Sequence, residues 1–139
     1  MAARASFLAL LLIVTACSTA PPPAAPGSTA ATERPRFTEL GLASWYGRDH
    51  QGLKTAAGER FDMRKLTAAH RTLPLDTVVR VTNVDNQRTV KVRINDRGPY
   101  ARNRIIDLSL QAARALDIGD DGTARVRLEV FASDQGGGN

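Results

Sequence analysis

The 139-residue chain is poor in cysteine, histidine and aromatic residues, and each shortage removes a class of protein from consideration. A single cysteine excludes an intramolecular disulfide. Two histidines, with the one cysteine far from them, give no recognised metal-ligand spacing, so neither a metal nor another cofactor is expected. The sequence also contains no glycine-rich phosphate loop and no Gly-x-Ser-x-Gly segment, which excludes the enzyme classes that depend on them.

Basic residues outnumber acidic residues by 19 to 14, which gives a net charge of +5. All but three of the basic residues are arginine. Such an excess indicates a polyanionic neighbour, which can be nucleic acid, a membrane surface or a cell-wall polymer. The arginines are spread along the chain and no nucleic-acid-binding motif is present, so we expect no nucleic-acid partner.

The one sustained apolar run, residues 7–14, is too short to span a membrane. An arginine precedes it and small residues follow it, as in a secretory signal. Leu12–Cys17 resembles the bacterial lipobox, which implies a lipoprotein signal peptide over residues 1–16 and diacylglycerol on the sulfur of Cys17. Ser18, rather than aspartate, follows the lipidated residue and favours anchoring in the outer membrane, with the protein facing the periplasm of a bacterial cell envelope.

Composition divides the rest of the chain into a tether, one domain and a tail. Residues 17–36 are rich in alanine and proline and hold five of the seven prolines, so they are expected to form a disordered tether. Residues 37–132 contain the segments of alternating apolar and polar residues and are long enough for one domain with a core. Residues 133–139 are glycine-rich and are expected to form a disordered tail.

The domain is predicted to be mainly β, because its apolar residues recur mostly at every second position. Ser109 is typical of an N-cap, and Leu110 and Leu116 predict a short helix that ends before Gly119. Residues 65–72 are expected to form a short helical turn. Short strands with one helix and turns between them favour a small β-barrel. The predicted strands are residues 40–47, 77–84, 88–95, 105–108 and 125–130.

The segment 90–99 combines a strand signal with a candidate catalytic group. Val92 and Ile94 alternate with polar residues, and Asp96 comes next in the apolar register, so its side chain is predicted to point inward. Gly98 and Pro99 end the strand and leave the carboxylate at its open end. A carboxylate at the mouth of a core and flanked by arginine is typical of a catalytic group, and a cap of the following turn is the alternative.

Five segments that follow one another along the domain carry a family pattern: Ala43–Gly47, Thr55–Asp62, Leu66–Pro74, Asn95–Pro99 and Arg104–Ser109. Together they resemble the rare lipoprotein A (RlpA-like) family. The resemblance implies a six-stranded double-psi β-barrel with one or two short helices, similar to the barrel of expansins and some endoglucanases. It also implies that peptidoglycan glycan strands are the substrate. The implied enzyme is a lytic transglycosylase, which cleaves the β-1,4 bond between N-acetylmuramic acid and N-acetylglucosamine and leaves 1,6-anhydromuramyl ends. Cell-division and wall-synthesis proteins are candidate partners.

Cleaving a glycosidic bond without water needs a carboxyl group that protonates the leaving oxygen and then accepts the proton of the attacking sugar hydroxyl. Asp96 is the predicted acid and base, because the family pattern places a catalytic aspartate in its motif. Glu59 is predicted to act as a second acid or as a charge that stabilises the transition state. His70 is predicted to be a third catalytic residue, through a hydrogen bond to a carboxylate or a sugar. The residues predicted to bind substrate are Tyr46, Asp62, Asn95, Arg97 and Tyr100.

Other interpretations of single residues and of the whole groove stay open. Trp45 and Tyr46 suit either stacking on sugar rings or the core, and Asp107 is expected to cap the helix that follows it. A wall-binding or wall-loosening module would use the same groove without cleavage, as expansins do. A hydrolase would use two carboxylates with water. Many RlpA-like proteins carry a C-terminal sporulation-related repeat domain that binds glycan strands without stem peptides, and the resemblance does not extend to such a domain here.

Overall fold

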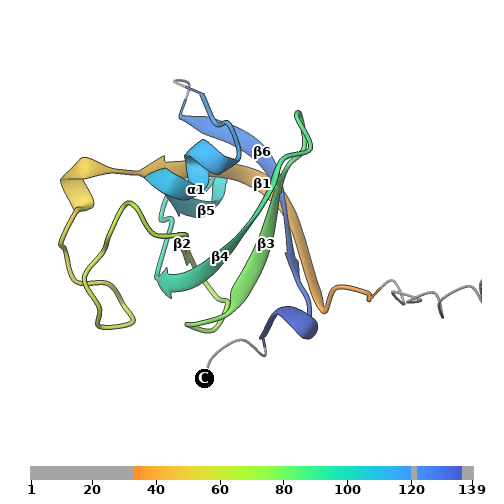
Figure 1. Cartoon of the computed structure of the whole chain (residues 1–139), viewed down its shortest axis with the longest axis horizontal. Helices are drawn as coiled ribbons and strands as arrows, with labels where there is room; N and C mark the ends of the chain where they lie inside the picture. Colours follow the sequence, from red (N-terminus) through yellow and green to blue (C-terminus); the bar gives the residue numbers. More distant parts are fainter. Residues whose placement is uncertain (1–32, 120–121, 136–139) are drawn as a thin grey trace, which may run out of the picture. The chain divides into compact units, whose positions relative to one another are not determined.

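The computed structural model describes residues 33–119 and 122–135, and the predicted signal peptide, Cys17 and most of the predicted tether lie outside them. The described part of the chain forms a barrel of strands with short helical segments (Figure 1). The strands are β1 (Phe37–Tyr46), β2 (Thr67–His70), β3 (Val78–Asn83), β4 (Thr89–Asp96), β5 (Arg104–Ser109) and β6 (Thr123–Val130). The helical segments are η1 (Arg48–His50), α1 (Leu110–Ala115) and η2 (Ser133–Gln135), of which η1 and η2 are 3-10 helices.

The strands close into a barrel in the order β1-β5-β2-β4-β3-β6, which differs from their order along the chain. β1 pairs with β5, and β2 pairs with β4, in parallel, whereas the other neighbours are antiparallel. The prediction of a mainly β, six-stranded double-psi barrel with short helices is confirmed. Within residues 33–119 and 122–135, no helix is both long enough and apolar enough to cross a membrane.

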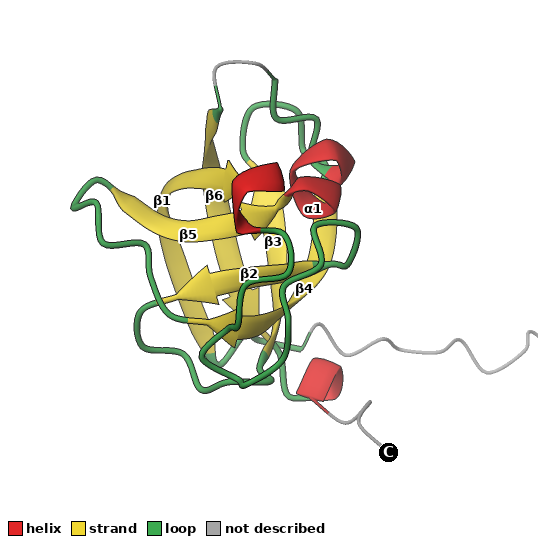
Figure 2. Cartoon of the chain, turned by 90° about the vertical axis from the view of Figure 1, so that its left-hand side faces the viewer, coloured by secondary structure: helices red, strands yellow, loops and turns green. Residues whose placement is uncertain are grey.

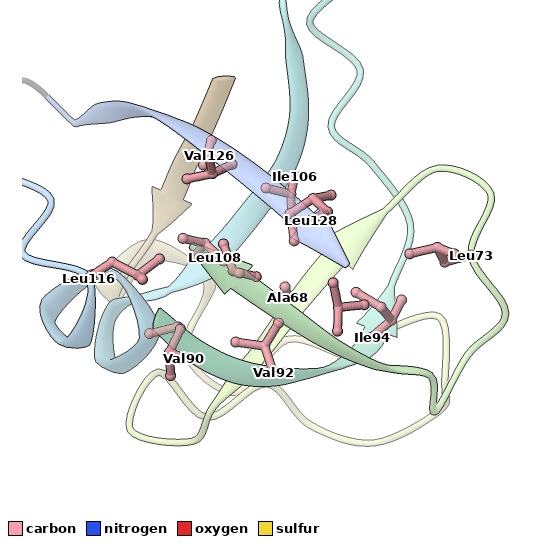
Figure 3. Packing of buried hydrophobic residues seen from close by; sticks show 14 of the residues in the cluster. Ala68, Leu73, Val90, Val92, Ile94, Ile106, Leu108, Leu116, Val126 and Leu128 are labelled. Carbon is pink, nitrogen blue, oxygen red and sulfur yellow. The ribbon is translucent and has the colours of Figure 1, made fainter. Parts of the chain in front are cut away.

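Aliphatic side chains from alternate strand positions fill the barrel (Figure 3). Val92 and Ile94 of β4, and Ile106 and Leu108 of β5, are at most 1 % exposed. Burying one such side chain contributes about 1.5–3 kcal/mol, so a core of this size stabilises the barrel without disulfides. Because most inward positions are apolar, most polar residues of the strands project from the outer face of the barrel, where the loops and α1 cover part of them.

The predicted N-cap of the helix is confirmed. The Ser109 hydroxyl accepts a hydrogen bond from the backbone N–H of Ala112 at 3.2 Å and donates one to the carbonyl of Lys65 at 2.6 Å. Leu116 follows α1 as its C-cap residue and is fully buried in the barrel core. Asp117 then adopts a positive φ of 54°, so the helix ends sooner than the position of Gly119 suggests.

Two predictions about local structure are wrong. Residues 65–72 form no helical turn, because Thr67–His70 is strand β2, and all four of its residues are buried. A strand that is covered on both faces shows no alternation in sequence, which is why the signal was missed. The tail does not become disordered at Ser133, because Ser133–Gln135 form η2 and Asp134 pairs with Lys91 at 2.6 Å. The barrel also begins slightly before β1, since the backbone N–H of Arg36 donates to the carbonyl of Val130.

Candidate active site

A β-bulge near the end of β4 decides where Asp96 points. The pairing between β2 and β4 runs from Ala68 opposite Ile94 to Ala69 opposite Asp96, so Asn95 is the extra residue. Such a bulge places two residues of one strand opposite one of its partner and turns the following side chain. Ile94 is fully buried in the core, whereas Asp96 is partly exposed. The prediction that Asp96 points into the core is therefore wrong, and its carboxylate lies on the outer face.

Four residues form a row across the outer face of four neighbouring strands. Ser44 of β1 pairs with Asp107 of β5, Asp107 pairs with Ala69 of β2, and Ala69 pairs with Asp96 of β4. Figure 2 shows these four strands side by side. Neighbouring strands lie about 4.8 Å apart, so the Cα atoms of the two aspartates are separated by about 10 Å. Only the methyl group of Ala69 stands between them in the row, which leaves a hollow with a carboxylate on each side.

Two adjoining cavities cover this row. The smaller one, about 330 Å³, is called the acid cavity here and includes Ala69 and Asp96 among its lining residues. The larger one, about 760 Å³, is called the basic cavity and includes three arginines and Trp45. Both cavities share Tyr46, His50 and Asp107, so they form one continuous groove. Of the residues predicted to bind substrate, Tyr46, Arg97 and Tyr100 line the acid cavity, and Tyr100 is 87 % exposed at its rim.

The Asp96 carboxylate is fixed at one oxygen and open at the other. Oδ1 accepts hydrogen bonds from the backbone N–H groups of Ala56 at 3.0 Å and Arg97 at 2.8 Å. No donor within the described residues reaches Oδ2. The next residue but one, Gly98, has a φ of +125°, a conformation that favours glycine and lets the chain turn away from β4. The carboxylate is thus held in place, with one oxygen available to a ligand in the acid cavity.

The hydroxyl of Tyr46 is buried between the two cavities, and no described residue hydrogen-bonds to it. The ring packs against Phe61 and His50, with centroid separations of 4.6 and 5.1 Å. Burial raises the pKa of this hydroxyl, and the charges of Asp96 and Asp107 raise it further. The hydroxyl therefore stays protonated at neutral pH, as a buried donor without a partner among the described residues.

Glu59 contacts Asn95, the neighbour of Asp96, but it lines neither cavity and is already engaged by other side chains. Its Oε1 accepts hydrogen bonds from Asn95 Nδ2 at 2.7 Å and from Arg93 Nη2 at 2.6 Å. These two donors hold the pKa of the Glu59 carboxyl below its usual value, so the group is ionised at neutral pH. The turn that carries Glu59 is tied to the bulge, because the backbone N–H of Ala57 donates to the carbonyl of Asn95. Glu59 therefore fits the predicted electrostatic role better than the role of a second acid.

Asp107 belongs to the groove, and the expectation that it caps α1 is wrong. Its Oδ1 accepts a hydrogen bond from the Ser44 hydroxyl at 3.1 Å and lies 3.5 Å from Arg104 Nε. Arg104 Nη1 also donates to the same hydroxyl at 2.8 Å. Ser109, two residues later, is the residue that caps α1. Sequence spacing could not reveal this cluster, because it depends on the parallel pairing of β1 with β5.

The structure places His70 and Asp62 away from Asp96. In β2 the side chain of Ala69 faces the acid cavity, so the next side chain, that of His70, projects from the opposite face of the strand. His70 Nε2 lies 3.0 Å from Glu39 Oε2, and Nδ1 accepts hydrogen bonds from the backbone N–H groups of Thr72 and Leu73. Asp62 pairs with Arg64 on the exposed loop before β2 and is not among the lining residues of either cavity.

Several groove residues were not identified from the sequence. Arg48 and His50 come from η1, Arg104 from the start of β5 and Arg114 from α1. Each of them lies in a different segment, and only the barrel topology brings them together. No group of three or more histidine, cysteine, aspartate or glutamate side chains in residues 33–119 and 122–135 is arranged to hold a metal ion.

Comparisons with known proteins agree with this architecture. A family model described as lytic transglycolase matches residues 38–128. Two relatives named endolytic peptidoglycan transglycosylase RlpA are similar to the chain: the protein of Campylobacter jejuni is 54% identical over 104 residues, and that of Neisseria meningitidis is 52% identical over 99 residues. These matches cover 73% and 71% of this chain but only 38% and 41% of the relatives, so the chain spans less than half of their length.

Two solved structures resemble the barrel. A Streptomyces papain inhibitor superimposes with a TM-score of 0.52 at 23% identity and covers 69% of this chain and 96% of that one. The expansin of Clavibacter michiganensis superimposes with a TM-score of 0.51 at 24% identity and covers 69% of this chain and 52% of that one. At these identities the two structures show the fold alone.

Proposed function

The chain belongs to the lytic transglycolase family, and from this premise we propose that it is an endolytic peptidoglycan transglycosylase. The substrate is the glycan strand of peptidoglycan, which is cleaved between N-acetylmuramic acid and N-acetylglucosamine with formation of a 1,6-anhydromuramyl end. The observation that carries the proposal is the arrangement of the acid cavity. One Asp96 oxygen is fixed by two backbone N–H groups and the other faces the cavity, next to the unpartnered hydroxyl of Tyr46.

Asp96 performs both proton transfers of the reaction. In its protonated form it gives its proton to the glycosidic oxygen while the bond from that oxygen to C1 breaks. The C6 hydroxyl of the same N-acetylmuramic acid attacks C1, and the ionised Asp96 accepts the hydroxyl proton. The carboxyl group is then protonated again, and no water enters the products. One fixed carboxylate is sufficient for this cycle because the nucleophile is part of the substrate.

The other groups of the groove position the sugar and balance its charge. Asp107 is the second carboxylate that faces the substrate, and its negative charge stabilises the positive centre that develops at C1. Glu59 acts mainly through Asn95, because Arg93 already balances part of its charge. The Tyr46 ring forms a wall that the two cavities share. Tyr100, at the rim of the acid cavity, offers an aromatic face for stacking on a sugar ring.

His70 is a positioning residue in this proposal. Its Nδ1 holds the turn after β2 through the backbone N–H groups of Thr72 and Leu73. The same turn holds the guanidinium of Arg97, which donates to the carbonyls of His70 and Leu73 at 3.2 and 2.7 Å. Arg97 follows Asp96 directly, so the imidazole supports the segment that carries the proposed acid.

The place of action is the bacterial cell envelope. The lipobox at residues 12–17 supports a diacylglycerol anchor on Cys17, and Ser18 favours the outer membrane, with the barrel in the periplasm. Proteins of cell division or wall synthesis are the proposed partners there. Replacing Cys17 by alanine is expected to release the protein from the membrane fraction, and retention of the variant with membranes would contradict the anchor.

Product analysis with matched variants tests the proposed reaction. Wild type, Asp96→Asn and Asp85→Asn are each incubated with intact and denuded peptidoglycan, and the soluble products are identified by mass spectrometry. Asp85 is the control because it is exposed in the turn between β3 and β4, at the other end of β4 from Asp96. Wild type and Asp85→Asn are expected to release anhydromuramyl products. Asp96→Asn is expected to lose about 10²–10⁴-fold in rate, the usual contribution of general acid–base catalysis.

Two outcomes would replace the proposal by another function. Products with reducing ends would indicate hydrolysis, in which Asp96 and Asp107 act on opposite sides of the bond with a water between them. Binding of peptidoglycan without any products would indicate a wall-binding module. The circular dichroism spectrum of each variant shows whether a loss of products reflects chemistry or unfolding.

A further inference from the structure

Three arginines face the basic cavity from three different elements. Arg48 belongs to η1, Arg104 to the start of β5, and Arg114 to the last turn of α1. Arg104 is engaged by Ser44 and Asp107. Arg48 and Arg114 are exposed, and their side chains have no ion pair or hydrogen bond with any residue that the structure describes. By contrast, Arg80 and Arg93 elsewhere on the barrel each contact an acidic partner.

The charges of the basic cavity do not balance. The opposing carboxylates are Asp49 and Asp107, and Asp107 is already bound by Ser44 and lies next to Arg104. Trp45 also lines the cavity, but its indole Nε1–H is buried and its side chain packs against the barrel core, so the arginines supply the donors that a ligand can reach. Guanidinium groups donate hydrogen bonds and accept none. A cavity with an excess of such donors suits an anionic ligand, and the planar guanidinium suits a carboxylate.

The basic cavity continues the groove beyond the proposed acid. It shares Tyr46, His50 and Asp107 with the acid cavity, and Ser44 lies about 14 Å from Asp96, three strand spacings along the row. A glycan strand whose reacting bond lies at Asp96 therefore extends into the basic cavity. Along such a strand, the anionic groups are carried by the lactyl substituent of muramic acid. The substituent ends in a free carboxylate or carries a stem peptide that has carboxylates of its own.

We propose that the basic cavity is a subsite for a carboxylate borne by a muramic acid unit of the bound strand, with Arg48 and Arg114 as its main contacts. This subsite rests on the proposed function, because it requires a peptidoglycan strand in the groove. It distinguishes muramic acid from the neutral sugars of the strand, and so fixes which of the two alternating glycosidic bonds lies at Asp96. The lactyl carboxylate and the carboxylates of a stem peptide share this chemistry.

Binding measurements on the whole chain, purified in mild detergent, test the subsite. The Asp96→Asn variant serves as the background, so that ligands are bound without turnover. Three ligands are compared: denuded glycan strands, strands that bear stem peptides, and denuded strands whose lactyl carboxyl groups have been reduced to alcohols. The test variant adds Arg48→Gln and Arg114→Gln. Arg88→Gln is the control for net charge, because Arg88 is exposed just before β4 and does not line the basic cavity; its removal lowers the net charge by one, whereas the test variant lowers it by two.

The test variant is expected to bind strands that carry carboxylates about tenfold more weakly, the effect of losing one or two charge-assisted hydrogen bonds. Its affinity for the reduced strands stays that of the background, as does the affinity of the Arg88→Gln control for all three ligands. If affinity is lost only for denuded strands, the bound group is the lactyl carboxylate. If it is lost only for peptide-bearing strands, the bound group is a carboxylate of the stem peptide. Arg48→Lys with Arg114→Lys is expected to recover part of the affinity, since the charges are kept.

Equal weakening for all three ligands, or no weakening for any, overturns the subsite. So does an Arg88→Gln control that loses as much affinity as the test variant. Failure of the proposed function is recognised separately, from the products of the wild-type chain. If the wild-type chain releases anhydromuramyl products but the arginine substitutions do not weaken binding, only the subsite is refuted. If the substitutions weaken binding as expected but the wild-type chain releases no such products, only the proposed activity is refuted.

Discussion

Replacing His70 by asparagine separates a positioning role from direct chemistry. His70 is 3 % exposed, and its Nδ1 accepts the backbone N–H groups of Thr72 and Leu73 at 3.2 and 3.1 Å. The Oδ1 atom of asparagine reaches nearly the same position as Nδ1, so His70→Asn keeps this acceptor and loses the contact with Glu39. His70→Ala loses both. If His70 acts only through the turn, the asparagine variant retains activity and the alanine variant does not.

The expected losses of stability follow from these contacts. His70→Ala leaves two N–H groups without an acceptor, at about 1–3 kcal/mol each when they are buried, so about 3 kcal/mol is expected in total. His70→Asn loses the hydrogen bond to Glu39, whose side chain is 37 % exposed, at about 1 kcal/mol or less, and it also loses the edge contact of the imidazole with Phe37. In a domain of this size 1 kcal/mol lowers Tm by about 4–8 °C. The asparagine variant should therefore melt below wild type but well above the alanine variant.

The assay is the rate of release of anhydromuramyl products, with kcat and KM determined separately and at a temperature where every variant is folded. We expect kcat of His70→Asn to stay within about tenfold of wild type, whereas loss of a true proton-transfer group lowers rates about 10²–10⁴-fold. A His70→Asn protein with nearly the Tm of wild type, but with kcat reduced a hundredfold or more, would refute the positioning role and return His70 to the reaction itself.

Three other substitutions test the site and the barrel. Glu59→Gln should lower Tm at neutral pH, because the pKa of Glu59 is lower in the folded chain than its ordinary value of 4.5. The stability that this difference contributes is present above pH 4.5 and is lost as the pH falls through the folded pKa. The melting temperatures of wild type and variant should therefore converge at acid pH. Ala69→Val should leave the circular dichroism spectrum unchanged, since valine favours strands. The larger side chain should fill the hollow between Asp96 and Asp107 and lower kcat/KM about a hundredfold. Unchanged kinetics would mean that the substrate binds elsewhere. Leu128→Ala should lower the free energy of unfolding by about 2–5 kcal/mol in urea titrations, because Leu128 is fully buried in the core, and a loss below about 1 kcal/mol would contradict its place there.

Sequence patterns predicted strands wherever one face is buried. β3, β4 and β6 alternate, over most of their length, between buried and less buried residues, and their bounds were predicted to within two residues. β2 gives no such signal, because Ala68 belongs to the core while Ala69 is covered on the outer face. An alanine-rich segment of this kind is typical of a helix, and only its pairing with β4 and β5 makes it a strand.

The site was harder to predict than the fold, for reasons that lie in β4 and β5. Strict alternation places Asp96 inward, and the bulge at Asn95 reverses its direction. No single-sequence pattern marks such a bulge, since it arises where two parallel strands meet. The position of Asp107 in the sequence likewise predicts a helix cap. In the structure its carboxylate lies in the groove instead, where it contacts Ser44 of β1, 63 residues away in the sequence. Motifs thus identified chemistry-bearing residues, while tertiary pairing decided their orientation and neighbours.

The proposal that Asp96 cleaves glycan strands without water is tested most directly by running the reaction in water labelled with the heavy oxygen isotope. In the proposed cycle the C6 hydroxyl of the sugar is the nucleophile, so no solvent oxygen enters the new end. We predict that wild-type products carry anhydromuramyl ends, each one water lighter than a reducing end, with no heavy oxygen. Incorporation of one heavy oxygen at C1 of the products would contradict the account and identify the groove as that of a hydrolase.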